Sequence, residues 1–391
     1  MKLAFFSRFV PPAIDGIGDY TWHLASRLRD SGIDTRIYTS KDQPSPKSEG
    51  WIHPVIAEWR GKKFLEAISS IPFEPDSCSF QYVPHLYGRY GLCWETTELP
   101  LILRKKWDCR IHVTFHEIAI EAGADPVHFL LRKLMLWQAR RLARASDSVV
   151  TTCTEYAETL RGLAQDREVK VIPVGANVLA CETSDEELAK LRRHYRMGSA
   201  KVLAMFGRLT ALRNYPAAIR LLGQAKKENL DARLMVIGIE EACNPSLFQE
   251  LISLARDLKV ENDLIFPGRL SRESVSRHLQ LADLYLFPQF DGISTKNGSV
   301  MAALAHGLPL LSYAPFPGYW IEEPVPEIAL AATGDEAGWI QAGIKRLRQE
   351  KDGSQKRRRN ALYFEQNFSW PRIAAEFLDA MNVKKECVKG I

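Results

Sequence analysis

Two arginines in the second half of the chain follow a buried-strand pattern. Arg208 and Arg213 stand between the apolar run 201–206 and a helical pattern over 216–227. Side chains at the carboxyl end of a parallel strand project toward the crevice in which such sheets bind ligands. A guanidinium group stays charged at any useful pH, and its fork of donors matches a diphosphate. We therefore predict that both bind a diphosphate. The alternative is two solvated surface arginines.

A second candidate is a loop of small polar residues that runs into a helix of small residues. Its candidate diphosphate-binding residues are Lys296, Asn297, Gly298 and Ser299. Amides at Gly298 and Ser299 would bind a phosphate at the helix N-terminus, with the Lys296 ammonium alongside. The alternative is a capped helix start that binds nothing.

Two further side chains could contact a sugar. Asp291 stands at the start of the same loop and could accept hydrogen bonds from sugar hydroxyls. His116 ends the predicted strand 111–115, at the rim of the first domain. This position would suit a function at the reaction site. The alternative is a structural histidine, which is the more common case for a lone histidine at a strand end.

Two glycines follow the first predicted strand, 3–7. Gly16 and Gly18 stand just before a helical pattern that ends at Gly32. They would let the backbone approach a phosphate and leave the first N–H groups of the helix available to an anion. The third glycine of a dinucleotide fingerprint is missing. A flexible strand-to-helix turn is therefore the alternative.

Apolar runs alternate with helical patterns along the chain. This order predicts doubly wound parallel sheets of the α/β class. A length of 391 residues predicts two domains, which we expect to face each other across a cleft. The polar stretch 182–198 places their connection. The predicted strands are 3–7, 35–38, 78–83, 111–115, 148–153, 169–174, 201–206, 233–237, 264–266, 284–287 and 308–312.

Composition excludes several classes of protein. The chain has 52 basic and 47 acidic residues, and a net charge of +5 is too small to indicate a nucleic-acid partner. No apolar run approaches the roughly 18 to 20 residues that span a bilayer, and the start does not read as a signal peptide. The seven cysteines form no Cys-x-x-Cys pair. We therefore expect no zinc site, no disulfide framework and a cytoplasmic location.

In this order, the candidate segments resemble the retaining glycosyltransferases of family 4, which have the GT-B fold. The resemblance extends over nearly the whole chain and includes residues 15–19, 115–117, 171–177, 207–209, 213–214, 266–270, 282–288 and 305–309. It implies an acceptor-side Rossmann-like domain over 1–180 and a nucleotide-sugar-binding domain over 181–368. It also implies a helix over 369–391 that crosses back to the first domain.

The resemblance also implies functions for individual residues. Arg208 matches the family's arginine and Arg213 its usual lysine, and both would hold the donor diphosphate. Gly16 and Gly18 match the glycine loop that approaches the phosphates and the reacting sugar. His116 matches a histidine near the donor sugar and the reaction centre.

One departure concerns the family's two glutamates, which are separated by seven residues. The second falls on Ala302, which has no carboxylate. Without a gap, the first falls on Ser294. With a three-residue insertion it falls on Asp291, and we prefer this match because it keeps an acidic residue before a glycine. The second glutamate normally binds the ribose, so its loss puts the nucleotide contact and the base preference in question.

The sequence as a whole predicts transfer of a sugar from a nucleotide-diphosphate sugar to a hydroxyl acceptor, with retention and without a metal or other cofactor. A catalytically degenerate sugar-nucleotide-binding or scaffold protein is the alternative that Ala302 suggests. A nicotinamide dehydrogenase with two Rossmann-like halves is a third, disfavoured by the missing fingerprint.

Peripheral membrane contact is a separate question. The segment 130–144 is basic and amphipathic, as interfacial helices are. A core helix with a solvated basic face has the same pattern, and we favour it here.

Overall fold

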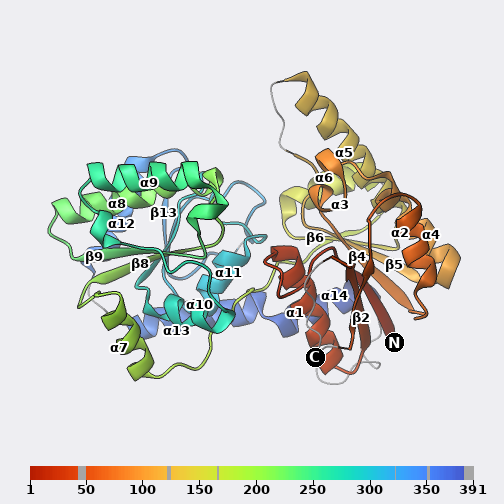
Figure 1. The fold of residues 1–391 in the computed structure, drawn as a ribbon, viewed down its shortest axis with the longest axis horizontal. Helices are drawn as coiled ribbons and strands as arrows, with labels where there is room; N and C mark the ends of the chain where they lie inside the picture. Colours follow the sequence, from red (N-terminus) through yellow and green to blue (C-terminus); the bar gives the residue numbers. More distant parts are fainter. Residues whose placement is uncertain (43–49, 121–124, 165–166, 322, 350–352, 383–391) are drawn as a thin grey trace. The chain divides into compact units, whose positions relative to one another are not determined.

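The computed structural model describes residues 1–391 except for 43–49, 121–124, 165–166, 322, 350–352 and 383–391. The chain divides into two units. Unit 1 contains Met1–Gly175 and Trp370–Ile391, and unit 2 contains Ala176–Ser369. Each unit is an α/β sandwich around its own parallel sheet (Figure 1). The predicted α/β class is confirmed.

Unit 1 is built on seven parallel strands in the order β3-β2-β1-β4-β5-β6-β7. The strands are β1 (Lys2–Phe6), β2 (Asp34–Ser40), β3 (Ile52–Ile56), β4 (Ser77–Tyr82), β5 (Arg110–Phe115), β6 (Ser148–Thr151) and β7 (Val169–Val171). Helices α2, α4, α5 and α6 form one layer, and α1 and α14 form the other. The helices are α1 (Gly16–Asp30), α2 (Gly61–Ser70), α3 (Pro84–Tyr87), α4 (Trp94–Trp107), α5 (Pro126–Ala145), α6 (Thr154–Ala164) and α14 (Trp370–Ala380).

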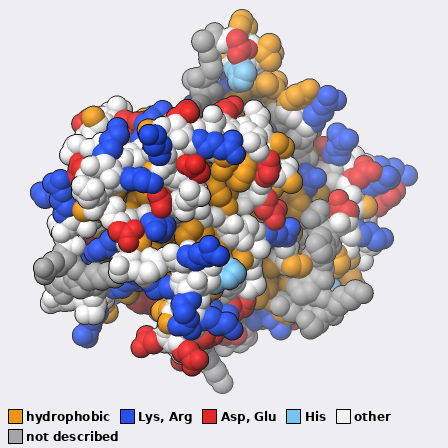
Figure 2. Space-filling model, turned by 60° about the vertical axis from the view of Figure 1, so that its left-hand side comes forward, with side chains coloured by type: hydrophobic (Ala, Val, Ile, Leu, Met, Phe, Trp, Pro, Cys, Tyr) orange, Lys and Arg blue, Asp and Glu red, His pale blue; other side chains and the backbone are white. Residues whose placement is uncertain are grey.

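Unit 2 repeats this plan with six parallel strands in the order β10-β9-β8-β11-β12-β13. The strands are β8 (Lys201–Phe206), β9 (Ala232–Ile237), β10 (Leu264–Ile265), β11 (Leu284–Phe287), β12 (Leu310–Tyr313) and β13 (Ile328–Ala331). The helices are α7 (Asp185–His194), α8 (Tyr215–Lys227), α9 (Pro245–Asp257), α10 (Arg272–Leu281), α11 (Gly298–Ala305), α12 (Glu336–Arg348) and α13 (Gly353–Phe368). Basic and acidic side chains are interspersed over the face in Figure 2, as the small net charge leads one to expect.

The predicted connecting stretch 182–198 contains a helix, α7, that has no buried residue. Polar residues throughout hide its periodicity. Its start is nevertheless encoded, because Ser184 and Glu187 form a reciprocal capping box, with the Glu187 carboxylate 2.9 Å from the Ser184 amide.

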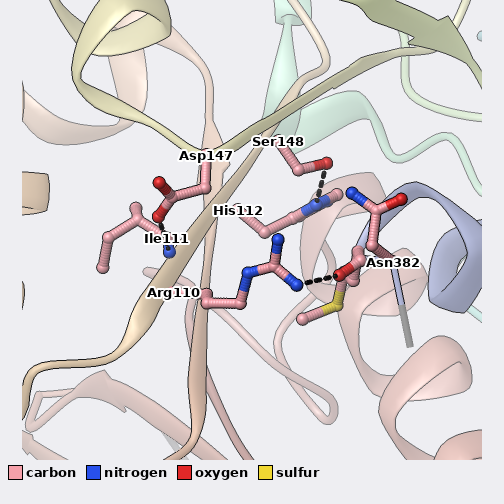
Figure 3. A pocket seen from close by; sticks show the side chains of 7 residues that line it. Arg110, Ile111, His112, Asp147, Ser148 and Asn382 are labelled. Carbon is pink, nitrogen blue, oxygen red and sulfur yellow. Dashed lines mark hydrogen bonds between the residues drawn. The ribbon is translucent and has the colours of Figure 1, made fainter. Parts of the chain in front are cut away.

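Helix α14, from the far end of the chain, packs on the sheet of unit 1. The Phe377 ring stacks on Phe5 at 5.7 Å and meets the His112 ring edge-on at 4.5 Å. Figure 3 shows the amino-terminal ends of β5 and β6 beside the end of this helix. There Ser148 Oγ donates to the Ala380 carbonyl at 2.8 Å, and Arg110 donates to the Met381 carbonyl at 3.2 Å. These bonds tie α14 to β5 and β6.

The six cysteines in the described part of the chain are free thiols; Cys387 lies outside it.

Candidate functional site

The strand order of unit 2 reverses between β8 and β11, which are neighbours in the sheet although β9 and β10 lie between them in the chain. Open parallel sheets bind ligands at such a switch point, beyond the carboxyl ends of the strands. The loop after β8 carries Arg208 and Arg213, and the loop after β11 leads to Gly298 and Ser299. The fold therefore brings the two main sequence candidates to one edge of one sheet.

Arg213 is held in a fixed position at this edge. One guanidinium nitrogen donates to the Phe206 carbonyl at 2.6 Å, and another donates to Ser299 Oγ at 3.4 Å. Gly207 has φ +138°, and a Cβ there would lie 2.5 Å from Arg213 Cζ. Glycine is therefore required for the guanidinium group to lie against the backbone.

Neither arginine of this loop has a carboxylate partner among the residues that the structure describes. Arg213 is half-buried and bonded only to neutral oxygens, and Arg208 is exposed with no ion pair. By contrast, three other half-buried arginines of unit 2 form ion pairs with carboxylates: Arg233, Arg277 and Arg346, the last with Glu327 at 3.3 Å. The positive charge at the switch point is therefore available to an anion.

The first turn of α11 is open to a ligand. Asn297, its N-cap, accepts with its side chain from the Ser294 amide at 2.7 Å and does not cap the helix. The amide of Val300 donates to the Asn297 carbonyl at 2.9 Å, whereas those of Gly298 and Ser299 have no partner within the described ranges. Two free N–H groups at the positive end of a helix dipole are suited to a phosphate.

A buried tyrosine that sequence analysis did not find bonds to the end of β8. The Tyr285 hydroxyl, on β11, donates to the Phe206 carbonyl at 3.4 Å. Burial raises the pKa of this hydroxyl, and Arg213 and Ser299 partly oppose the shift. Tyr285 thus shares the carbonyl that anchors Arg213. The continuous apolar run of β11 gives no sign of this contact.

Lys296 and Asp291 both contact residues of the segment that follows β12. Lys296 Nζ lies 4.4 Å from the centre of the Tyr319 ring, and the Asp291 carbonyl accepts from the Phe316 amide at 2.9 Å. Gly292 has φ +71°, and a Cβ there would lie 2.6 Å from the Ala314 carbonyl oxygen. The glycine after Asp291 is therefore needed for backbone packing against the loop after β12.

The first helix differs from the sequence expectation. Gly16 and Gly18 lie in the first turn of α1 and not in a loop before it. The Asp15 carboxylate caps the helix and accepts from the amides of Ile17 at 3.0 Å and Gly18 at 2.8 Å. Two of the amides that we expected to be available to an anion are therefore already satisfied by an acid.

The two glycines also differ from each other. A Cβ at Gly18 would lie 2.9 Å from the Phe9 backbone, so this glycine is explained by packing within the chain. A Cβ at Gly16 would meet nothing within 4 Å. Gly16 is thus the one of the two whose backbone a ligand can approach.

His116 lies directly after β5 and is buried. Its Nε2 is 2.9 Å from Gln81 Oε1, and Gln81 Nε2 donates to Ser79 at 3.0 Å. This arrangement assigns the imidazole proton to Nε2 and leaves Nδ1 as an acceptor. The ring meets Tyr20 edge-on at 4.8 Å. Burial lowers the pKa of His116 to about 3, so the ring is neutral at physiological pH.

Two family models match the chain. "Glycosyltransferase Family 4" matches residues 14–180 and "Glycosyl transferases group 1" matches residues 189–320. The chain is a family 4-like glycosyltransferase with the GT-B fold.

Solved structures of low sequence identity share the fold of this glycosyltransferase. HepE from Anabaena, in complex with UDP and glucose, is 15% identical with a TM-score of 0.71, over 98% of this chain and 100% of its own. Sucrose-phosphate synthase from Thermosynechococcus elongatus is 16% identical with a TM-score of 0.75, over 97% and 98%. A glycosyltransferase from Rickettsia africae is 13% identical with a TM-score of 0.68, over 98% of each chain. No curated protein matches the sequence.

The departure at Ala302 lies inside α11 of the glycosyltransferase. Ala302 is fully buried, and its carbonyl oxygen lies 2.7 Å from His306 Nδ1. This buried position therefore carries no carboxylate.

Outside the gaps in the description, the glycosyltransferase has no group of three or more His, Cys, Asp or Glu side chains that could hold a metal ion. None of its described helices is long and apolar enough to span a bilayer.

The buried histidines make the stability of this glycosyltransferase depend on pH. Burial lowers the pKa of His112 and His116 to about 3 and that of His306 to about 4. Below the unfolded pKa of about 6.5, the unfolded chain binds protons that the folded chain does not, so stability falls as the pH drops toward 4. Each histidine contributes roughly 1.4 kcal/mol per pH unit.

Urea unfolding at pH 7 and pH 5 measures this slope. In a His112→Asn variant the loss of stability between pH 7 and pH 5 should be smaller by about 2 kcal/mol, because His112 contributes its full slope only below pH 6.5, whatever the variant costs in stability at pH 7. An unchanged slope would show that His112 takes up a proton in the folded state.

Proposed function

We propose that this glycosyltransferase moves a sugar from a nucleotide-diphosphate sugar to a hydroxyl acceptor, with retention at the anomeric carbon. The observation that carries the proposal is the switch point of unit 2. There Arg213 lies against Ser299, next to the amides of Gly298 and Ser299, and neither the guanidinium group nor these amides are neutralised or bonded by an acid of the described chain. An unneutralised cation beside two free N–H groups matches a diphosphate.

The reaction requires that the negative charge on the leaving diphosphate be stabilised. The bond between the anomeric carbon and the diphosphate oxygen breaks, and the electron pair leaves on that oxygen. The acceptor oxygen bonds to the same carbon from the same face and loses its proton to the departing phosphate. Arg213, Arg208, Lys296 and the amides of Gly298 and Ser299 would stabilise the negative charge on the diphosphate. Because Arg213 is already positioned, this stabilisation needs little reorganisation.

We propose supporting functions for the remaining candidates, as the resemblance implies. His116, neutral and with Nδ1 as an acceptor, would hydrogen-bond to the donor sugar and would not act as an acid or base near pH 7. Asp291 would bind sugar hydroxyls, and the backbone at Gly16 would approach the donor. Asn297 would keep its helix start open by holding the Ser294 amide.

A thermal-shift screen of nucleoside diphosphates and their sugars tests the proposal. UDP and UDP-glucose come first, because HepE is solved with UDP and glucose. A ligand at 100 times its Kd stabilises the folded state by about 2.7 kcal/mol, which raises the melting temperature measurably. Turnover of the best donor should release nucleoside diphosphate and be unchanged by EDTA, because the chain supplies the positive charge. Loss of turnover in EDTA, restored by a divalent metal, would contradict the metal-free proposal.

A sugar-nucleotide-binding protein without transferase activity is the second candidate. The buried Ala302 favours it, since the carboxylate that normally binds the ribose is absent. Stabilisation by a donor without release of nucleoside diphosphate, across a broad panel of hydroxyl acceptors, would support this candidate over the enzyme.

A further inference from the structure

The amino-terminal half of α5 carries exposed apolar side chains. This part of the helix projects beyond the other helices of unit 1 (Figure 1). Val127, Phe129 and Leu130 are 64%, 55% and 58% exposed, and the buried residues of the helix begin only at Met135. The sequence interpretation as a core helix with a solvated basic face therefore holds only for the carboxyl-terminal half.

The apolar surface continues onto α4. Trp137 of α5 and Trp94 of α4 are both exposed, and their rings meet edge-on at 5.2 Å. Leu101, two turns after Trp94, is also exposed. Soluble proteins rarely leave a contiguous group of large apolar side chains in water without a partner.

Basic side chains lie among these apolar ones on the same stripe of α5. Lys133 Nζ lies 4.4 Å from the centre of the Phe129 ring, and the Arg141 guanidinium lies 5.1 Å from the Trp137 ring. At the top of Figure 2, hydrophobic side chains cover much of the projecting end of α5, and Lys and Arg side chains follow below it. We define the interfacial face by these residues: Trp94, Leu101, Phe129, Leu130, Lys133, Trp137, Arg140, Arg141 and Arg144.

The charge of the interfacial face is positive. Glu98 lies beside it and forms an ion pair with Arg141, and Asp125 at the helix start bonds to His128. Lys133 and Arg140 have no carboxylate partner among the residues described. A second copy of the chain would bring like charges together, which is unfavourable.

We propose that the interfacial face docks on the surface of a bilayer that contains anionic lipid. Exposed Trp and Phe side chains prefer the headgroup level, and interleaved Lys and Arg side chains are attracted to negative headgroups. Because α5 cannot span the bilayer, it would lie along the surface with its apolar side chains in the interface. This docking does not depend on the donor assignment.

Co-sedimentation of the full chain with vesicles tests the proposal. The vesicles are phosphatidylcholine alone or an equal mixture of phosphatidylcholine and phosphatidylglycerol. We expect binding to the mixed vesicles at low salt and its loss at high salt. Phe129→Ser with Leu130→Ser should lower the binding constant at least ~10-fold, because the apolar contact is removed. Lys133→Gln with Arg140→Gln should lower it ~30-fold.

Matched controls lie on unit 2. Leu330→Ser with Leu362→Ser, and Lys227→Gln with Arg256→Gln, make the same changes at exposed positions and should leave binding unchanged. The four side chains replaced on the interfacial face are exposed, and the Lys133 ammonium contacts the Phe129 ring. The melting temperatures of these variants should therefore match that of the parent within a few degrees.

Three results would overturn the proposal. They are no binding to the mixed vesicles, equal binding to both kinds of vesicle, and equal losses in the control variants. A concentration-dependent dimer that Phe129→Ser with Leu130→Ser abolishes would assign the face to a second copy instead.

Discussion

Replacing Arg213 by alanine is expected to lower kcat/KM for the donor roughly 100-fold to 1000-fold, the usual effect of removing one preorganised donor to a developing anion. The guanidinium group lies ready at the switch point, held by the Phe206 carbonyl and Ser299 Oγ. Initial rates at varied donor concentration measure the change. Arg213→Lys should fall between the parent and alanine, because lysine keeps the charge and loses the planar fork.

Arg220→Ala is the matched control for this experiment. Arg220 lies on α8, shortly after Arg213, and pairs with Glu336 at 2.9 Å at an exposed position. Its removal should change kcat/KM less than about twofold, because surface ion pairs contribute little. If Arg213→Ala keeps kcat/KM within a few-fold of the parent, the guanidinium group does not contact the leaving diphosphate.

Replacing Phe377 by alanine is expected to destabilise unit 1 by about 3–5 kcal/mol, the usual cost of truncating a buried phenylalanine. Phe377 is fully buried between Phe5 of β1 and His112 of β5. Phe377→Leu keeps most of the volume and should cost less than about 1.5 kcal/mol.

Hydrogen exchange resolved by peptide distinguishes the two units in the Phe377→Ala protein. Exchange should accelerate in peptides that contain β1 and β5, while peptides that contain β8 and β11 stay at the parent rate. Equal acceleration in both units would mean that α14 does not stabilise unit 1 in particular.

Much of the fold was predictable because strands buried on both faces are continuous apolar runs. The runs 3–7 and 201–206 correspond to β1 and β8. Strand β3 was missed, since Pro54 and a partly exposed edge position interrupt its pattern. Helix α7 was missed because it buries nothing, although the Ser184 capping signal was present.

The site was predictable only in part. The types of Arg208 and Arg213, and their place after a strand, indicated anion binding from local sequence. The contact between Arg213 and Ser299 joins residues 86 positions apart and depends on the strand order, which no local pattern encodes. The occupied amides of α1 could have been foreseen, because an aspartate at the start of a helix is a common N-cap.

We propose that the edge of the unit 2 sheet that carries Arg208 and Arg213 holds the donor diphosphate. A crystal structure with UDP bound, or with whichever nucleoside diphosphate stabilises the protein most, tests it most directly. We predict phosphate oxygens within hydrogen-bond distance of the Arg213 guanidinium group and of the amides of Gly298 and Ser299. A diphosphate bound elsewhere, with Arg213 contacting only Phe206 and Ser299, would contradict the claim.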